Sequence, residues 1–284
     1  MEAYVRELAR FLGSPERYQA ARSLRLEFYV TPPEEQHKDA ASTAVGRAMA
    51  ACLTSALRWP QLERLAIYAF PRGVAAASGA HEISDPEFIE ALRLMDSRLA
   101  TLHVKNCLTK SGGGYGLLFP ALSRLTIEIT PGVKAVFPRS YFNDLLQSCR
   151  DLVFLRLVSC NFAGSVEALP FKLHLLPASK LGELVLSACN FQDVRLVNTP
   201  SLERLLIHKR DRLCLTVDNA PRLATLVAAP WIYGSGTART LRFVELSSLN
   251  SRQSQERLES FFQCIPKVEV LELCFRDGWV NGMR

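Results

Sequence analysis

Histidine and cysteine are the residues through which this chain could bind a metal ion or attack a substrate. The chain has five histidines and eight cysteines in 284 residues. Its nearest His and Cys are His103 and Cys107, and a strand followed by a turn would direct these two side chains to opposite sides. The cysteines include no Cys-x-x-Cys pair, and eight cysteines in a chain of this length do not indicate a disulfide framework. We therefore expect no metal site.

Two further kinds of chemistry need a loop of defined sequence. Hydrolysis by an activated serine uses a Gly-x-Ser-x-Gly turn, which the chain lacks. A phosphate-binding loop needs Lys and Ser/Thr after its glycines, and the glycine-rich run at 111–116 has neither in place. We therefore expect no enzyme activity and no cofactor.

A repeated strand motif organises the chain instead. LVFLRLVSCN at 152–161 returns as LGELVLSACN at 181–190, which is the L-x-x-L-x-L-x-x-C-N signature of leucine-rich repeats. Cys107, Cys160 and Cys189 fall at the Asn/Cys position of this motif, where a buried thiol is expected. The motif recurs with first residues Leu62, Leu99, Leu122, Leu152, Leu181, Leu202, Leu223, Leu241 and Val268.

This motif predicts an α/β leucine-rich repeat solenoid, or horseshoe, with a parallel concave sheet. The convex side is expected to carry irregular helices or extended segments. We expect residues 1–60 to form a helical cap and the first edge strand, and residues 61–284 to form the repeats, as one continuous solenoid. The predicted elements are helices at 2–12, 40–57, 85–95 and 251–264, a strand at 23–30, and extended segments at 194–197 and 213–217.

Alternation along each strand separates buried from exposed side chains. The second and third apolar positions of the motif point into the stack, and the residues between and beside them line the concave face. That face combines an apolar centre with Arg and aromatic residues, which is the composition of a protein-binding hot spot. The predicted contact residues are His103, Arg124, Phe154, Arg156, Val185, Arg204, Leu206, His208 and Val227.

The charge and the apolar segments of the chain indicate which class of partner and which cellular location to expect. The net charge of +6 is spread over interleaved acidic and basic residues, so nucleic acid is not an expected partner. The chain has no apolar run of the roughly 18 to 20 residues that a membrane-spanning helix needs, and its first residues are not a secretory signal. We expect no membrane partner and a cytoplasmic or nuclear location.

Further motifs resemble a known family. Asn198-Thr-Pro-Ser-Leu202 and Asn219-Ala-Pro-Arg-Leu223 open similar units, and FFQCIPKVEVLEL at 261–273 closes the chain. Together with the irregular repeats, these segments resemble the leucine-rich region of plant F-box/LRR proteins, especially those of grasses, over 21–275.

The resemblance implies a function. In that family an N-terminal F-box docks on a Skp1-like protein of a cullin ubiquitin ligase, and the leucine-rich part captures the protein substrate. Residues 1–60 here contain no Leu-Pro-Asp/Glu opening typical of an F-box, which leaves a Skp1-like partner open. The alternative is a stand-alone leucine-rich scaffold, or a truncated F-box-like protein, with no link to ubiquitination.

Overall fold

The structure is a computed structural model in which the chain forms two compact units, residues 1–150 and residues 151–284. Each unit is described by itself below as unit 1 and unit 2. The described residues are 2–18, 20–30, 38–56, 59–71, 81–83, 90–92, 94–95, 98–109, 120–131, 136–137, 149–162, 171–174, 180–189, 193–208, 214–218, 220–228, 242–249 and 268–275.

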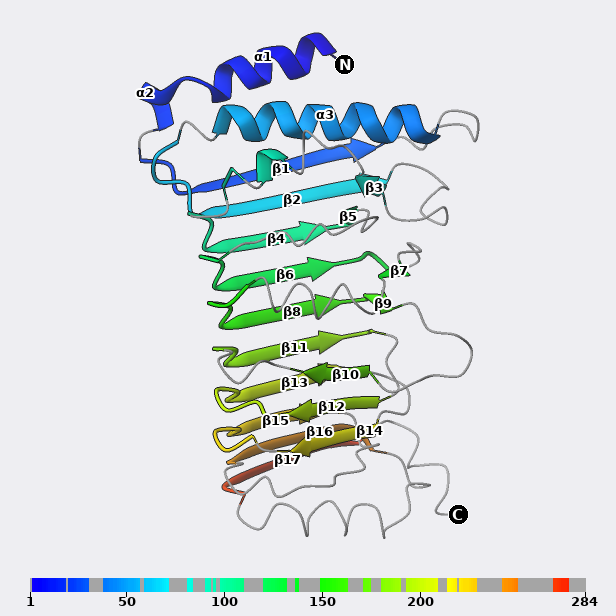
Figure 1. Ribbon diagram of the computed structural model, residues 1–284. Coiled ribbons are helices and arrows are strands. Elements are labelled where there is room, and N and C mark those ends of the chain that lie inside the picture. The colour runs from blue at the N-terminus through cyan, green and yellow to red at the C-terminus, as the bar shows by residue number, and fades with distance from the viewer. Residues whose placement is uncertain are drawn as a thin grey trace. The chain divides into compact units, whose positions relative to one another are not determined.

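Unit 1 is built on a parallel sheet with the strand order β1-β2-β4-β6 (Figure 1). A second, shorter parallel pair, β3 with β5, lies behind it. The elements are α1 (Glu2–Leu12), α2 (Pro15–Tyr18), β1 (Ser23–Val30), α3 (Lys38–Ala56), β2 (Arg64–Pro71), β3 (His81–Ile83), β4 (Thr101–Lys105), β5 (Cys107–Thr109), β6 (Arg124–Glu128) and β7 (Val136–Phe137).

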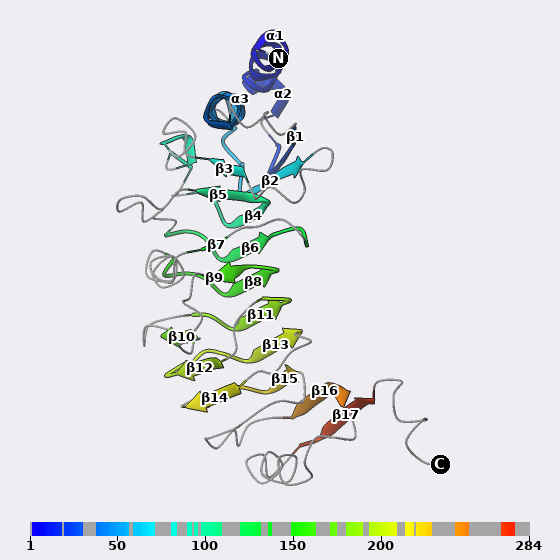
Figure 2. The same cartoon turned by 90° about the vertical axis from the view of Figure 1, so that its right-hand side faces the viewer.

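Unit 2 contains two parallel layers. One has the order β8-β11-β13-β15-β16-β17, and the other, β10-β12-β14, forms the back of the unit (Figure 2). The elements are β8 (Phe154–Val158), β9 (Asn161–Phe162), β10 (Phe171–His174), β11 (Glu183–Ser187), β12 (Asp193–Val197), β13 (Arg204–His208), β14 (Cys214–Asp218), β15 (Thr225–Ala228), β16 (Phe243–Leu249) and β17 (Val270–Phe275).

The core of each unit is a set of leucine rows. Leu155, Leu184 and Leu205 are paired in register on β8, β11 and β13, and all are fully buried. Leu65, Leu102 and Leu125 form the corresponding row on β2, β4 and β6. Because each leucine packs against the same position of the next repeat, burial is supplied by neighbouring repeats. The inward positions predicted from the motif are confirmed.

A backbone junction repeats where the strands begin. The carbonyl of Gly182 accepts hydrogen bonds from the amides of Glu203 and Arg204, at 2.8 and 2.9 Å. The carbonyls of Val153 and Glu203 each accept two amides from the following repeat in the same way. The same arrangement occurs in unit 1 at Arg22, Glu63 and Ala100. The junction fixes the register between repeats independently of loop length.

Each of four strands is followed directly by a non-glycine residue with a left-handed backbone conformation. Asn106, Ser159, Ala188 and Asn198 have φ angles of 53°, 52°, 52° and 57°. The Asn106, Ser159 and Ala188 amides donate to the carbonyl of the last residue of the neighbouring strand, at 2.7 to 2.8 Å. This conformation turns the chain away from the sheet before the buried Cys160 and Cys189.

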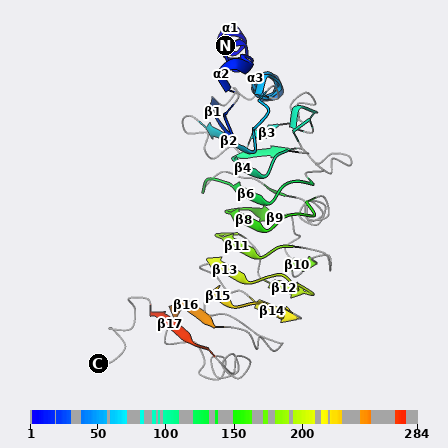
Figure 3. The ribbon, with the colours of Figure 1, turned by 90° about the vertical axis from the view of Figure 1, so that its left-hand side faces the viewer.

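A helical cap covers one end of unit 1. α3 packs against β1 and against α1, so it lies between α1 and the edge of the sheet (Figures 1 and 3). Trp59 joins the cap to the first repeats. Its indole Nε1 donates a buried hydrogen bond of 2.8 Å to the Leu12 carbonyl, and its ring stacks on Tyr18 with centroids 4.4 Å apart. The cap is therefore held by both apolar packing and a directional bond.

Five of the predicted elements have a counterpart in the structure. The helix at 2–12, the strand at 23–30 and the helix at 40–57 correspond to α1, β1 and α3. The extended segments at 194–197 and 213–217 correspond to β12 and β14. Most of the helix at 85–95 and all of that at 251–264 lie outside the described residues. The division into 1–60 and 61–284 stays a prediction.

Candidate functional site

The sheet face of unit 2 that points away from the buried leucines is called its outer face below. It is the face that the motif predicted to be concave, and it carries the predicted apolar centre. Arg156, Val185, Leu206 and Val227 are paired in register and form one row across β8, β11, β13 and β15. Arg156 is exposed and Leu206 is half-buried, whereas Val185 and Val227 are only 8% and 6% exposed. The centre of the row is therefore already packed, and Arg156 and Leu206 supply most of its accessible surface.

Charged and aromatic side chains flank this row. Phe154, Glu183 and Arg204 occupy the preceding outward position of β8, β11 and β13, and exposed His208 lies at the last position of β13. Arg204 Nη1 lies 3.2 Å from Glu183 Oε2. An ion pair this exposed adds little stability, but it holds the Arg204 guanidinium above the strands. The predicted contact residues of unit 2 thus lie together on one face.

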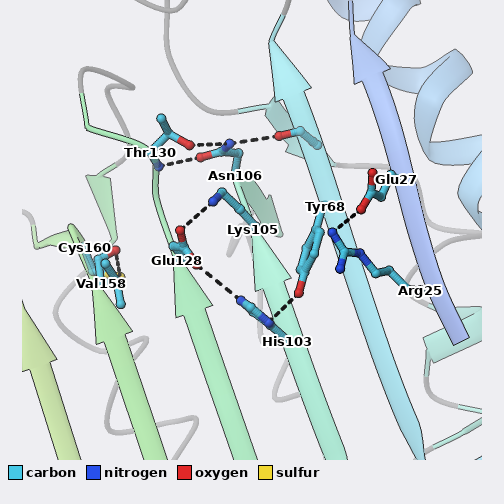
Figure 4. A network of polar contacts seen from close by, with 11 residues as sticks. Arg25, Glu27, Tyr68, His103, Lys105, Asn106, Glu128, Thr130, Val158 and Cys160 are labelled. Carbon is cyan, nitrogen blue, oxygen red and sulfur yellow. Dashed lines mark hydrogen bonds and ion pairs between the residues drawn. The ribbon is translucent and has the colours of Figure 1, made fainter. Parts of the chain in front are cut away.

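The outer face of unit 1 places His103 in a polar network (Figure 4). The His103 Nδ1 and Tyr68 Oη atoms are hydrogen-bonded at 2.7 Å, and the two rings meet edge to face with centroids 4.7 Å apart. His103 Nε2 lies 3.5 Å from Glu128 Oε2. Contacts on both ring nitrogens fix the orientation of the imidazole. His103 is therefore a positioned side chain of this face.

Glu128 is the acceptor at the centre of the network. Lys105 Nζ donates to Glu128 Oε1 at 2.6 Å from the directly paired position of β4. Partial burial by itself raises the pKa of the Glu128 carboxyl. The hydrogen bond and charge of Lys105, together with His103, outweigh burial and hold this pKa below its usual value. Glu128 is accordingly a carboxylate at neutral pH.

Arg25 extends the network to the edge strand β1. Its guanidinium lies 4.6 Å above the centre of the Tyr68 ring and forms an ion pair with Glu27 on the same strand. A cation over an aromatic face is attracted by the partial negative charge that the ring quadrupole places there. Side chains from β1, β2, β4 and β6 are thus linked into one cluster across unit 1 (Figure 4).

The motif predicts only part of these faces. It places His103 and Arg124 on an outer face, whereas Tyr68, Lys105 and Glu128 are not among the predicted contact residues. It missed the contacts of Arg25 and Glu27 altogether. The signal available was that Tyr68, Lys105 and Glu128 share the same position of consecutive motifs. In a parallel sheet such residues become neighbours, but their spacing in sequence does not show which of them meet.

The buried thiols of Cys52, Cys160 and Cys189 are unsuited to nucleophilic chemistry. Cys160 and Cys189 are buried at the Asn/Cys position, and the Cys189 thiol donates to the Ser187 and Leu157 carbonyls. A hydrogen bond with Cys189, followed by burial, raises the pKa of the Cys160 thiol far above its usual value. Burial likewise raises the pKa of Cys52. A thiol that stays protonated is a poor nucleophile and a poor metal ligand.

Among the residues that the structure describes, no cluster of three or more His, Cys, Asp or Glu residues is arranged to hold a metal ion. No helix among those residues is long and apolar enough to cross a membrane. The features that remain as candidate sites are the two outer sheet faces.

Comparison with protein families gives a match over residues 80–229. The matching family is described as "FBD-associated F-box protein At5g56370, LRR repeats". The match covers more than half of the chain and includes strands of both units. The chain belongs to this family of leucine-rich repeat proteins. Comparison with curated proteins finds no match.

Membership accounts for the parallel strands and buried leucine rows of this F-box-type leucine-rich repeat protein. The resemblance to plant F-box/LRR proteins and the α/β leucine-rich repeat fold are confirmed. All of the predicted contact residues lie inside the matched segment, whereas Arg25, Glu27 and Tyr68 precede it. Repeats of this class commonly present a sheet face to a protein, so the family indicates an interaction module.

Proposed function

We propose that this chain captures a protein substrate for ubiquitination, and that it binds the substrate through the outer face of unit 2. The observation that carries the proposal is the row formed by Arg156, Val185, Leu206 and Val227, in which half-buried Leu206 offers apolar surface close to the exposed Arg156 and Arg204. A partner could cover the centre while its polar groups meet the rim.

The chemistry of this face favours a protein partner. Arg156 and Arg204 are exposed arginines, a residue type enriched at binding hot spots, and Phe154 adds an aromatic side chain beside them. The strands below are fixed by ladder bonds and by the repeated carbonyl junction. A face that is already ordered loses little conformational entropy on binding, which favours affinity.

The link to ubiquitination is supported by the family description, which names an F-box protein. In such proteins the F-box recruits a Skp1-like subunit, while the leucine-rich repeats bind the substrate. A Skp1-like protein is accordingly a proposed second partner, and the location that suits both partners is the cytoplasm or the nucleus.

Affinity purification from plant cell extract tests the proposal. The tagged wild-type chain is compared with Arg156→Glu/Leu206→Asp, and bound proteins are identified by mass spectrometry. We expect the double variant to lose the proteins that bind the wild type, while Skp1-like and cullin subunits remain. Arg156→Glu alone, which alters only an exposed side chain, should show a partial loss.

Arg222→Glu is the matched control, because Arg222 is an exposed arginine of the same unit and lies outside the paired strands. It should bind the same proteins as the wild type. Thermal unfolding of every variant separates lost binding from lost folding, which matters because Leu206 is half-buried. Full binding by a folded double variant would exclude this face. Retained partners without Skp1-like or cullin subunits would favour the stand-alone scaffold.

A further inference from the structure

Arg156 is an uncompensated cation on the outer face of unit 2. Its side chain is exposed, and it forms no hydrogen bond or ion pair with a residue that the structure describes. Arg204, the other arginine of β8, β11, β13 and β15, lies 3.2 Å from Glu183 and is engaged by it. Glu183 is the one acidic residue at the described outward positions of these four strands. Between the two arginines and the glutamate, one positive charge therefore remains, at Arg156.

Apolar side chains border Arg156 on its own strand. Phe154 and Val158 lie two residues away on either side, so the three side chains emerge on the same face of β8, and both neighbours are half-buried. An ion pair formed beside apolar groups is less screened by water than one in open solvent. A carboxylate at Arg156 would therefore be held more firmly than at an isolated surface arginine.

The row that contains Arg156 offers accessible apolar surface two strands away. Leu206 on β13 is half-buried, whereas Val185, which lies between them on β11, is only 8% exposed. Val227, beyond Leu206, is 6% exposed. A partner can therefore contact this row at Arg156 and at Leu206, and it gains little by directing a side chain at Val185.

We propose that the segment recognised by this row carries an acidic residue that binds Arg156 and an aliphatic residue, three positions away, that packs on Leu206. The inference rests on the proposed function, since it names the class of protein segment that the outer face of unit 2 captures. The carboxylate matches the guanidinium, which can donate two parallel hydrogen bonds to it. The aliphatic side chain removes the remaining apolar surface of Leu206 from water.

The separation of the two contacts sets the conformation of the segment. Neighbouring strands lie about 4.8 Å apart, so the backbones of Arg156 and Leu206 are about 10 Å apart with β11 between them. In a polyproline II conformation every third residue points the same way, at a separation of about 9 Å. The two residues in between point to other sides, so neither is directed at the closed Val185. An α-helix would need about seven residues for the same separation, and its intervening turn would point at Val185.

A carboxylate suits this site better than a phosphate. One guanidinium balances one negative charge, whereas a phosphorylated side chain carries about −1.5 to −2 at neutral pH. The additional charge would lie on the same face as Glu183, which already engages Arg204. Nucleic acid is disfavoured for the same reason, because its closely spaced phosphates need several cations.

Selection from a random peptide display library on the immobilised full chain tests the proposal. We expect the selected peptides to be enriched in Asp or Glu placed three positions from Leu, Ile or Val. Selection on Arg156→Gln should lose the acidic residue and keep the aliphatic one, and selection on Leu206→Ser should do the reverse. Arg156→Gln changes only an exposed side chain, so it remains informative where Leu206→Ser does not fold.

Fluorescence anisotropy with a labelled peptide from the wild-type selection then measures the contribution of the charge. Replacing the acidic residue of the peptide by its amide should weaken binding to the wild type about three- to fivefold, and should leave binding to Arg156→Gln unchanged. The matched control is Arg222→Gln, because Arg222 is an exposed arginine of the same unit outside the paired strands. This control should keep the preference of the wild type for the acidic peptide.

Three results would overturn the proposal. They are a selection without the acidic and aliphatic pair at this spacing, an acid preference that survives in Arg156→Gln or is also lost in Arg222→Gln, and tighter binding when phosphoserine replaces the acidic residue. Any of these, combined with loss of the cellular partners by Arg156→Glu/Leu206→Asp, would mean that this inference fails while the proposed function stands. Retained partners in that folded double variant would exclude the proposed function whichever peptides are selected.

Discussion

Lys105 Nζ lies 2.6 Å from Glu128 Oε1 between directly paired positions of β4 and β6. The pair is partly shielded from solvent, with 25% and 26% of the two side chains exposed. It joins two repeats of unit 1 on the outer face, where the leucine rows do not reach. The contribution of this pair to stability depends on the ionisation of Glu128. It can therefore be measured by following stability as a function of pH.

The pH dependence of stability follows from Glu128. Its pKa is lowered in the folded protein relative to an unfolded glutamate at about 4.3, so its stabilising contribution is complete above that value. The contribution is lost as pH falls from about 4.3 through the folded pKa. We expect Lys105→Met to flatten the fall in unfolding free energy below this pH, measured by urea denaturation. Lys180→Met, which removes an exposed pair with Asp151, is the control and should leave the curve nearly parallel to wild type.

Asn106 should be the least replaceable polar residue described in unit 1. It is 1% exposed; its Nδ2 donates to the Ala69 carbonyl and to Thr130 Oγ1, and its Oδ1 accepts from the Thr130 amide at 2.6 Å. Asn106→Ala leaves buried groups unsatisfied and should cost about 2 to 4 kcal/mol. Asn106→Gly should cost about 1 kcal/mol less, because glycine accepts the left-handed φ. Equal losses in chemical denaturation would show that backbone strain is negligible at this position.

Ala188→Gly should stabilise unit 2. Ala188 is exposed and has a φ of 52°, where an alanine Cβ is strained and glycine is not. We expect a gain of about 0.5 to 1 kcal/mol in unfolding free energy. Ala224→Gly is the control, because Ala224 is not among the residues with positive φ and should lose stability instead. A loss in both variants would contradict the strain argument.

Gly182→Ala makes the opposite change at a neighbouring site. A Cβ built on Gly182 would lie 3.8 Å from its nearest neighbours, which are atoms of Val153 and the Ser201 carbonyl, so it fits without displacement. The corresponding position of the next repeats is occupied by Glu203 and Ala224. We expect alanine to raise the unfolding free energy by about 0.4 to 1 kcal/mol, because it restricts the unfolded chain. A lowered midpoint in thermal unfolding would show that the carbonyl junction needs glycine here.

Leu184→Ala tests the dependence of each repeat on its neighbours. Leu184 is fully buried between Leu155 and Leu205, so its truncation leaves a cavity and should cost about 2 to 5 kcal/mol. Leu206→Ala, on the outer side of the next strand, should cost less because Leu206 is half-buried. Comparable losses in urea denaturation would mean that the outer row is packed as tightly as the core.

The local pattern of the sequence determined most of the fold. The strand at 23–30 was predicted with the bounds of β1, and the leucines of the motif are the buried rows. These predictions succeed because alternation in a strand and repetition between strands are properties of adjacent residues. The same logic placed Arg156, Leu206 and His103 on outer faces, since each lies between inward positions of its own strand.

Tertiary structure alone decided which outer side chains meet and which are covered. Tyr68 and His103 are 35 residues apart, and their contact depends on the register that the carbonyl junction sets between repeats. Val185 and Val227 are outward in sequence but buried in the folded unit, because burial depends on the side chains of neighbouring strands. The left-handed backbone at Ala188 has no signal in its residue type. Contacts between repeats depend on register and packing over long sequence separations, which a motif within one repeat does not specify.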